Sequence, residues 1–392
     1  MRVLHVVPTY LPAVRYGGPI ASVHGLCKAL SRRGHDVDVY TTNIDGPGRS
    51  DVPLESPVDL DGVKVTYFSV PALRRIYWSP RLLNALRRTI HTFDMVHTHS
   101  VFLWPTSVAA RAATRSRIPY VLSPRGMLVK ELVARKSRRL KEAWIRIVEI
   151  RNLERAAAIH VTSQVEADEL RRFGFRLPPV AIVSNGIDSA TPGPQSAITG
   201  SIRELAAGPP YLLFLGRLNW KKGLDRMIAA LAVVPEARMV VAGNDEEGYR
   251  VTLDAHARSA GVEGRIAFVG PVYGDDKQFL LNHARALVVP SYSENFGNVV
   301  LEAMAAGCPV LATRSVGAAA LVEEHGAGIV VEGDAASIAR GVSDLLADPQ
   351  SSTAMGNRGA AAAANHYTWD VIAAKMEAVY EGIRRARATG LA

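Results

Sequence analysis

The apolar residues in the first half of the chain form short runs that alternate with helical patterns. The run at 2–8 is continuously apolar, as expected for a strand buried on both faces. A helical pattern follows to Arg33, Gly34 ends it, and a second run occupies 36–43. This order predicts a βαβ unit with a parallel sheet. Further strands are predicted at 63–70, 94–99, 118–123, 157–163 and 180–185.

The same alternation resumes in the second half, after a linker predicted at 189–210 because it is rich in Pro, Gly and Ser. The later strands are predicted at 211–215, 238–242, 265–269, 286–290, 309–313 and 327–331. We therefore predict two doubly wound α/β domains at 1–188 and 211–366. A terminal helix within 367–392 is expected to pack back toward the first domain. Such sheets bind ligands beyond the carboxyl ends of their strands, so a crevice between the domains is expected.

The charge is unevenly distributed along the chain. The net charge is +9, yet residues 1–190 hold 28 Lys and Arg against 16 Asp and Glu, which gives +12. The segment 111–155 alone has 13 basic and 4 acidic residues. This excess suggests that the first half meets a phospholipid surface, a lipid pyrophosphate or nucleic acid, unless it is an ordinary solvated basic face.

Other features restrict the class of protein. No apolar run approaches the roughly 18–20 residues of a membrane-spanning helix. Cys27 and Cys308 are far apart in apolar surroundings, so a disulfide is not expected. There is no GxxxxGK[ST] phosphate loop and no Cys/His cluster with metal spacing. We expect a cytoplasmic protein with no metal and no cofactor, and leave open a peripheral contact with the inner face of the cell membrane.

The segment 290–313 holds the densest candidate chemistry. A predicted strand ends at Pro290, and a helix is predicted from near Asn298. Glu294 then lies in the loop and Glu302 about one turn into the helix, so the two carboxylates can bracket one ligand. The helix N-terminus attracts a diphosphate, and a carboxylate behind it can accept from ribose hydroxyls. Each glutamate taken alone is also compatible with an ordinary helix cap.

The segment GRLNWKKG (216–223) contributes cations. Arg217 follows a predicted strand and Lys222 precedes the next helix, so both can reach a diphosphate at the carboxyl edge. When a sugar leaves a diphosphate, negative charge grows on the leaving group, and fixed cations stabilise that transition state. An ordinary solvated turn is the alternative interpretation.

The first half offers weaker candidates. His99 ends a predicted strand, whereas His97 is expected to be structural. Gly17 and Gly18 precede a helix and would let backbone approach a phosphate or an acceptor. Arg125, in SPRGML, could bind an acceptor's phosphate or carboxylate, or be a basic surface residue.

One predicted helix of the first half combines an apolar face with many cations. The apolar residues are Leu140, Trp144, Ile147 and Val148, and the cations are Lys136, Arg138, Arg139, Lys141 and Arg146. A helix of this kind can lie on an anionic membrane, or it can cover an ordinary core.

The order and spacing of these segments resemble glycosyltransferase family 4 over nearly the whole chain. Glu294 to Glu302 is similar to the family's E-x7-E signature. The other matching segments are 17–35, 94–100, 184–188, 216–223 and 367–369. The segment 123–128, with the basic stretch after it, resembles a bacterial subset that acts in surface-polysaccharide assembly. Asn244 is a departure, because the family often has a second glycine near that position.

The resemblance implies a GT-B fold of two facing Rossmann-like domains and a retaining, metal-independent transferase. Its donor would be a UDP- or GDP-linked hexose, and its acceptor a glycan or a lipid-linked glycan. The implied catalytic residues are His99, Arg217, Lys222 and Glu294. The implied donor-binding residues are Gly18, Arg217, Lys222, Glu294, Asn295, Phe296, Gly297, Asn298, Val299 and Glu302. The implied acceptor-binding residues are Gly17 and Arg125.

Two other classes of function are considered. A different GT-B-fold enzyme, such as a nucleotide-sugar epimerase, would use the same donor site without an acceptor. A binding module for anions or nucleic acid would exploit the basic first half. Base stacking requires aromatic residues among the cations, and 111–155 contains only Tyr120 and Trp144, so nucleic acid is not an expected partner.

Overall fold

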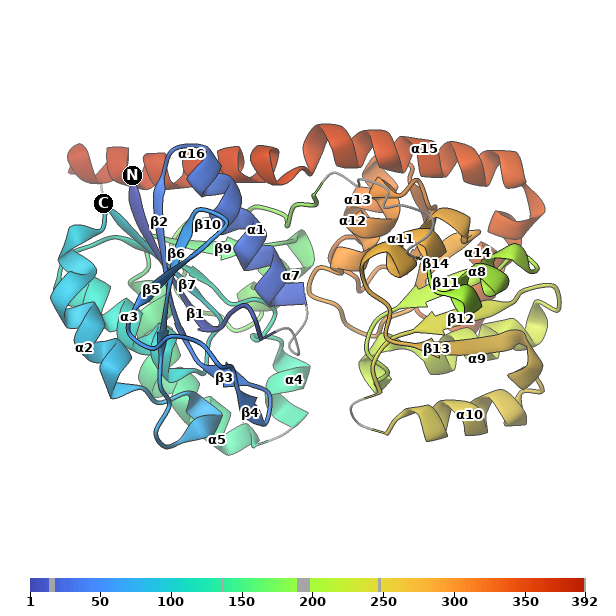
Figure 1. Ribbon diagram of the computed structural model, residues 1–392, viewed down its shortest axis with the longest axis horizontal. Coiled ribbons are helices and arrows are strands. Elements are labelled where there is room, and N and C mark those ends of the chain that lie inside the picture. Colours follow the sequence, from blue (N-terminus) through green and yellow to red (C-terminus); the bar gives the residue numbers. More distant parts are fainter. Residues whose placement is uncertain (14–17, 136, 189–197, 246–247, 391–392) are drawn as a thin grey trace. The chain divides into compact units, whose positions relative to one another are not determined.

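The computed structural model describes residues 1–13, 18–135, 137–188, 198–245 and 248–390. The chain divides into two compact units (Figure 1). Unit 1 contains Met1–Gly186 and Trp369–Ala392, and unit 2 contains Ile187–Thr368. Each unit has a sheet of mainly parallel strands with helices against it, so the predicted α/β class is confirmed.

Unit 1 is built on an eight-stranded sheet of order β10-β9-β8-β7-β1-β2-β6-β5. All neighbours are parallel except the edge strand β5, which is antiparallel to β6. The strands are β1 (Arg2–Thr9), β2 (Asp36–Thr42), β5 (Pro57–Leu60), β6 (Val63–Phe68), β7 (Met95–His99), β8 (Tyr120–Ser123), β9 (Ala158–Val161) and β10 (Val180–Ile182). Burial on both faces explains why the sequence shows continuous apolar runs rather than alternation.

The helices of unit 1 cover both faces of this sheet. They are α1 (Gly18–Arg32), α2 (Pro80–Thr89), α3 (Trp104–Arg115), α4 (Lys130–Arg135), α5 (Arg138–Trp144), α6 (Ile150–Glu154), α7 (Gln164–Arg171) and α16 (Trp369–Ala388). A π-helical turn, η3 (Ile145–Glu149), connects α5 to α6. The C-terminal helix α16 packs beside α1 and buries Trp369, Ile372, Met376 and Tyr380.

Unit 2 has a six-stranded parallel sheet of order β13-β12-β11-β14-β15-β16. Its strands are β11 (Leu212–Leu215), β12 (Met239–Ala242), β13 (Ile266–Gly270), β14 (Ala286–Val289), β15 (Val310–Thr313) and β16 (Gly328–Val331). Its helices are α8 (Gly200–Ala207), α9 (Leu224–Val233), α10 (Arg250–Ser259), α11 (Gly274–His283), α12 (Asn298–Ala305), α13 (Ala319–Glu324), α14 (Ala335–Ala347) and α15 (Pro349–His366). The chain order reverses between β11 and β14, and at such a point ligands bind beyond the strands.

Helix α8 lies inside the segment expected to be a linker. Thr199, just before this helix, donates from its backbone N–H and its hydroxyl to the Asp276 carboxylate, at 2.8 and 2.7 Å. Ile202 of α8 is buried. These contacts, which the Pro- and Gly-rich composition did not reveal, make part of the expected linker helical. No helix of the described residues is long and apolar enough to cross a membrane.

The loops after β11 and β12 approach each other closely. A Cβ atom at Gly243 would lie 1.8 Å from the carbonyl oxygen of Gly216, so only glycine fits there without a backbone shift. Beside this contact, the Leu218 N–H donates to the Asn244 carbonyl at 2.8 Å. Together these interactions hold the loops after β11 and β12 against each other at the carboxyl edge of the sheet.

We expect Gly243→Ala to lower the free energy of unfolding by about 3 kcal/mol or more, because a buried backbone contact must open. Urea denaturation followed by circular dichroism measures this loss. Gly264→Ala is the matched control, because no atom lies within 4 Å of a Cβ built there. Equal stability of the two variants would contradict the close approach of the loops.

Candidate functional site

Two residues predicted from separate motifs meet at the carboxyl edge of unit 2. Lys222 follows β11, Glu294 follows the neighbouring strand β14, and the Lys222 ammonium donates to Glu294 Oε2. Both side chains are partly exposed. A cation for a diphosphate and an acceptor for hydroxyls therefore lie within hydrogen-bonding distance of each other.

A second ion pair lies behind the first residues of α12. The Lys277 Nζ of α11 donates to Glu302 Oε1 at 3.0 Å. The prediction that Glu302 lies about one turn into the helix is confirmed, since α12 begins at Asn298. Lys277 was not predicted, because only the tertiary approach of α11 to α12 brings it to Glu302.

The N-terminus of α12 begins at a glycine. Its cap residue, Gly297, has φ of +90° and no side chain with which to cap the helix. A Cβ at Gly297 would lie 3.1 Å from Val316 Cγ1 and 3.3 Å from Glu294 Cγ. Both the positive φ and these short distances therefore favour glycine at this position. The N–H groups at the start of a helix can bind an anion.

Backbone hydrogen bonds hold the loop that carries Glu294. The Glu294 N–H donates to Ser315 O at 3.1 Å, and the Gly317 N–H donates to Glu294 O at 3.0 Å. Phe296 is 3% exposed and its carbonyl accepts from the Ala318 N–H at 2.8 Å. Its side chain therefore packs in the core, so the predicted donor contact of Phe296 is restricted to its backbone.

The remaining predicted donor residues lie near the same edge. Asn295 is in the loop, and Asn298 and Val299 are the first two residues of α12, all of them partly exposed. Arg217 follows β11 and is exposed. The structure thus brings the unit 2 candidates together, while their roles stay predictions.

In unit 1, four buried histidines form two hydrogen-bonded chains, and the first chain begins at α16. The Tyr380 hydroxyl lies 2.7 Å from His97 Nδ1, His97 Nε2 lies 3.3 Å from His160 Nδ1, and His160 Nε2 lies 2.9 Å from the Val183 carbonyl. The carbonyl can only accept, so for neutral rings each proton points from Tyr380 toward Val183.

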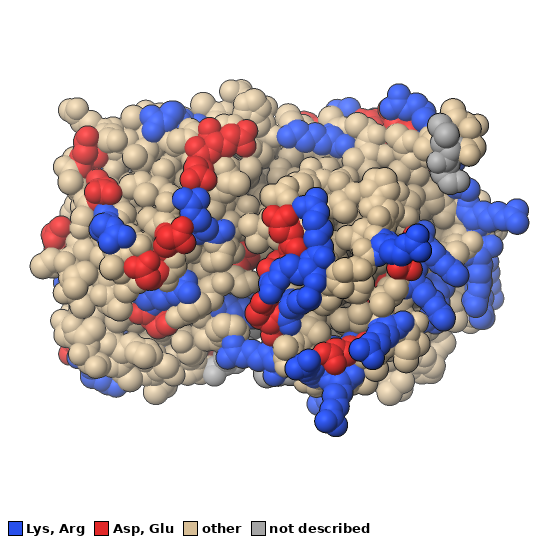
Figure 2. Space-filling view, turned by 180° about the vertical axis from the view of Figure 1, so that it is seen from behind, with Lys and Arg blue, Asp and Glu red and all other residues tan. Residues whose placement is uncertain are grey.

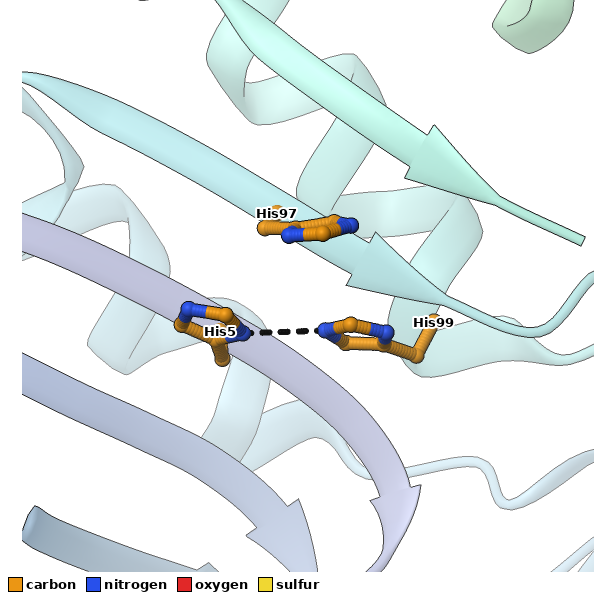
Figure 3. Close-up of side chains that lie close together, drawn as sticks. All are labelled: His5, His97 and His99. Atoms are coloured by element: carbon orange, nitrogen blue, oxygen red, sulfur yellow. Dashed lines mark hydrogen bonds between the residues drawn. The ribbon is translucent and has the colours of Figure 1, made fainter. Parts of the chain in front are cut away.

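The second chain runs from Arg125 to His5, and Figure 3 shows its hydrogen bond between His5 and His99. The Arg125 guanidinium donates to His99 Nδ1 at 3.3 and 3.2 Å from Nε and Nη2, so His99 carries its proton on Nε2. His99 Nε2 in turn lies 2.9 Å from His5 Nδ1. The planes of the His5 and His99 rings are nearly parallel, at 10° to each other. The centroids of the His97 and His99 rings lie 4.2 Å apart.

Burial keeps these rings uncharged. It lowers the pKa of His5 and His160 to about 3, with the charge of Arg125 as a second cause. Burial also lowers the pKa of His97 and His99 well below the usual value. A metal ion among His5, His97 and His99 would have to break the His5–His99 hydrogen bond beside a guanidinium, so these residues do not fit a cation site.

Arg125 is held at the carboxyl end of β8 in a strained conformation. Its φ is +54°, uncommon for a residue with a side chain, and Gly126 N–H donates to Glu166 Oε1 at 2.6 Å. Asn185 Oδ1 accepts from Arg125 Nη1 at 3.1 Å. Two more non-glycine residues with positive φ, Ser100 and Phe102, follow the neighbouring strand β7. Three of the nine non-glycine residues with positive φ among the described residues thus lie just after β7 and β8.

The candidate residues of unit 1 differ in their exposure, and one of them lies outside the described residues. His99 is 1% exposed and both its ring nitrogens are engaged, so a contact with a sugar requires Arg125 to move. Its catalytic role stays a prediction. Gly18 is the exposed first residue of α1, and Gly17 lies outside the described residues. His5, His160 and Tyr380 were missed, because nothing in a single strand or helix shows which ring nitrogens will meet.

The predicted apolar face of the basic helix is wrong. Leu140 and Ile147 are 71% and 63% exposed, whereas Ile145 and Val148 are buried. The π-helical turn at Ile145–Glu149 shifts the register, so the apolar residues divide between core and solvent. Lys136 lies outside the described residues.

The same helical segment borders a pocket of about 800 Å³ in unit 1. Its walls include the apolar residues Ile145, Ile150, Phe173 and Phe175. Its charged lining residues are the cations Lys130, Arg138, Arg146 and Arg176 and the acids Glu142 and Glu154, and Arg138 is paired with Glu142 at 2.7 Å. An apolar interior with a cationic border suits an amphiphile with an anionic group.

Two family descriptions match this chain. Residues 17–186 match the "Glycosyl transferase 4-like domain", and residues 201–362 match "Glycosyl transferases group 1". The D-inositol 3-phosphate glycosyltransferase of Streptomyces bingchenggensis is 32% identical over 75% of this chain and 69% of its own length. The glycogen synthase of Mycobacterium tuberculosis is 28% identical over 98% of this chain and 95% of its own.

Solved structures share the fold at low sequence identity. Sucrose-phosphate synthase from Thermosynechococcus elongatus gives a TM-score of 0.76 at 22% identity, covering 98% of this chain and 99% of its own. HepE from Anabaena, solved with UDP and glucose, gives 0.75 at 21% identity, covering 97% of this chain and 100% of its own. These likenesses confirm the predicted GT-B architecture.

The neutral histidines predict a stability that falls in acid. Their pKa values are lower folded than unfolded, so below about pH 6.5 the unfolded chain binds more protons. The contribution is fully present above pH 6.5 and is lost as the pH falls toward 3. In that window, each histidine that stays neutral in the folded chain should lower the free energy of unfolding by about 1.4 kcal/mol for each unit by which the pH falls. Urea unfolding at pH 7, 6 and 5 measures the slope.

Two variants test whether the buried histidines cause this dependence of stability on pH. His160→Gln should reduce the slope by about one histidine's share, while the exposed His256, changed to Gln, should leave it as it was. Equal slopes in the wild type and His160→Gln would show that His160 is not held neutral.

Proposed function

This chain belongs to glycosyltransferase family 4, and we propose that it is a retaining transferase that moves a hexose from a nucleoside diphosphate to a glycan or lipid-linked acceptor. The observation that carries the proposal is the group of two ion pairs, Lys222–Glu294 and Lys277–Glu302, near the N-terminus of α12. Polysaccharide assembly at a bacterial surface is the process proposed from the resemblance of 123–128.

The proposed donor site assigns one task to each group. Lys222, Arg217 and the N–H groups of α12 hold the diphosphate, where anions are stabilised by charge and by the helix dipole. Glu294 accepts hydrogen bonds from sugar hydroxyls. Glu302 accepts from the ribose hydroxyls, and Lys277 fixes the direction of its carboxylate.

The proposed reaction needs no nucleophile from the protein. The bond between the anomeric carbon and the diphosphate oxygen breaks, and its electron pair remains on the diphosphate beside Lys222 and Arg217. The acceptor hydroxyl bonds to the anomeric carbon from the same face, and its proton passes to the leaving phosphate oxygen. Fixed cations favour this because they stabilise charge that grows in the transition state.

For the acceptor we propose a lipid-linked anionic glycan. The support is the cationic and apolar pocket at Ile145–Ile150, together with Arg125 at the end of β8. Figure 2 shows Lys and Arg side chains gathered over unit 1, in the right-hand part of the view. Leu140 and Ile147, exposed among these cations, are proposed to enter the surface of an anionic membrane.

A thermal-shift panel with UDP, GDP, ADP and their sugars, in EDTA, tests the donor site. HepE, which shares the fold, was solved with UDP and glucose, so the uridine compounds come first. A ligand at 100 times its Kd should add about 2.7 kcal/mol of stability. We expect one nucleotide family to stabilise the wild type without metal, and Glu302→Ala and Lys277→Met to weaken that effect by tenfold or more in Kd, about 1.4 kcal/mol.

Glu323→Ala is the matched control for the panel. Glu323 forms an exposed ion pair with Arg314 in the same unit, so its loss should not change nucleotide binding. If no nucleotide stabilises the wild type, or if Glu323→Ala weakens binding as much as Glu302→Ala, the donor site is assigned wrongly.

Sedimentation with vesicles tests the membrane contact. We expect binding to vesicles that contain anionic lipid, less binding at high salt, and about a tenfold loss in Leu140→Ser or Ile147→Ser, since each removes apolar burial. Val251→Ser is the control, because Val251 is 73% exposed on α10 of unit 2. Equal binding of all three variants would contradict docking through these two residues.

A further inference from the structure

Unit 1 has a second pocket, of about 730 Å³, at the edge of its sheet opposite to Arg125. It is formed by the segments that enter β8, β9 and β10, with α16 along one side. Neither the donor site nor the proposed acceptor pocket shares a lining residue with it. Its volume lies within the usual range for small-molecule sites, about 300–1,000 Å³.

The pocket combines an apolar interior with cations and no acid. Apolar contacts come from residues such as Ile118, Pro119, Val379 and Ile383. The charged lining residues are Arg117, Arg155 and Arg387, and no Asp or Glu lines the pocket. The site is therefore complementary to an anion that also carries apolar surface.

Two of these arginines have guanidinium groups that no described residue pairs with. Neither the Arg117 nor the Arg155 guanidinium forms a hydrogen bond or an ion pair with a described residue, and Arg387 Nη2 donates to the Arg117 carbonyl at 2.6 Å. Unpaired guanidiniums beside an apolar pocket can take a phosphate or a carboxylate.

Helix α16 keeps the pocket open by means of a glycine. Gly382 lies inside this 20-residue helix, where glycine costs about 1 kcal/mol relative to alanine. No atom lies within 4 Å of a Cβ built on Gly382, so packing does not require the glycine. Its neighbours one turn away on the pocket side, Ala378 and Ala386, are also small. A larger side chain at 382 would occupy the space that a ligand needs.

We propose that this pocket binds a single-chain anionic amphiphile, with its alkyl chain against α16 and its phosphate or carboxylate at Arg117 and Arg155. The pocket is bounded by α16 on one side, and its volume of about 730 Å³ suits one chain of an amphiphile. The proposal is independent of the glycosyl transfer assigned to the other edge.

Isothermal titration of the full chain with decyl phosphate, kept below its micelle concentration, tests the proposal. We expect saturable binding, with inorganic phosphate and decyl trimethylammonium at least tenfold weaker. Gly382→Leu should abolish binding by filling the pocket, whereas Gly382→Ala should retain it. Arg117→Gln and Arg155→Gln should each weaken binding about tenfold or more, the usual effect of losing a charged hydrogen bond.

Arg384→Gln is the matched charge control, since Arg384 is exposed on the same helix outside the pocket lining. Thermal denaturation of each variant verifies that it folds. Unchanged affinity in Gly382→Leu, equal losses in Arg384→Gln and Arg155→Gln, or equal affinity for decyl phosphate and decyl trimethylammonium would overturn the proposal. Binding of inorganic phosphate as tight as that of decyl phosphate would do so as well, because the apolar wall would then contribute nothing.

Discussion

The ion pair between Lys222 and Glu294 is the interaction on which the proposed donor site of unit 2 depends. It connects the loops after two neighbouring strands, and a backbone hydrogen bond from Tyr292 N–H to Lys221 O, 2.7 Å long, connects the same loops. Each charge offsets the cost of withdrawing the other from water. Because both partners stay partly exposed, a diphosphate and a sugar can replace their mutual contact by contacts of their own.

Unit 1 positions its cation by a different principle. Arg125 contacts neutral histidines, and the Glu166 carboxylate accepts from the Gly126 and Thr162 N–H groups. The guanidinium is therefore oriented by hydrogen bonds to neutral groups, His99 and Asn185. The proposed donor site of paired charges and the separately held Arg125 are consistent with the proposed reaction between a diphosphate sugar and an anionic acceptor.

The sequence predicted those features that local patterns determine. The βαβ alternation, the start of α12 at Asn298 and the position of Glu302 followed from apolar runs and turn residues. What it could not predict depends on tertiary approach. Lys277 reaches Glu302 from another helix, His5 and His160 meet their partners across strands, and the π-helical turn moves Ile147 into solvent. Part of the expected linker became α8 through the contact of Thr199 with Asp276.

The central claim is that Lys222 and Glu294 act as one unit on the donor, and a double-mutant cycle on turnover tests it most directly. The measurement is the rate of nucleotide release from the nucleotide sugar that stabilises the chain, in the wild type, Lys222→Met, Glu294→Gln and the double variant. The account predicts that each single change lowers the rate about 100- to 1,000-fold, and that the double variant is slower than the slower single one by no more than about threefold. Single variants within about tenfold of the wild type, or losses that multiply in the double variant, would contradict it.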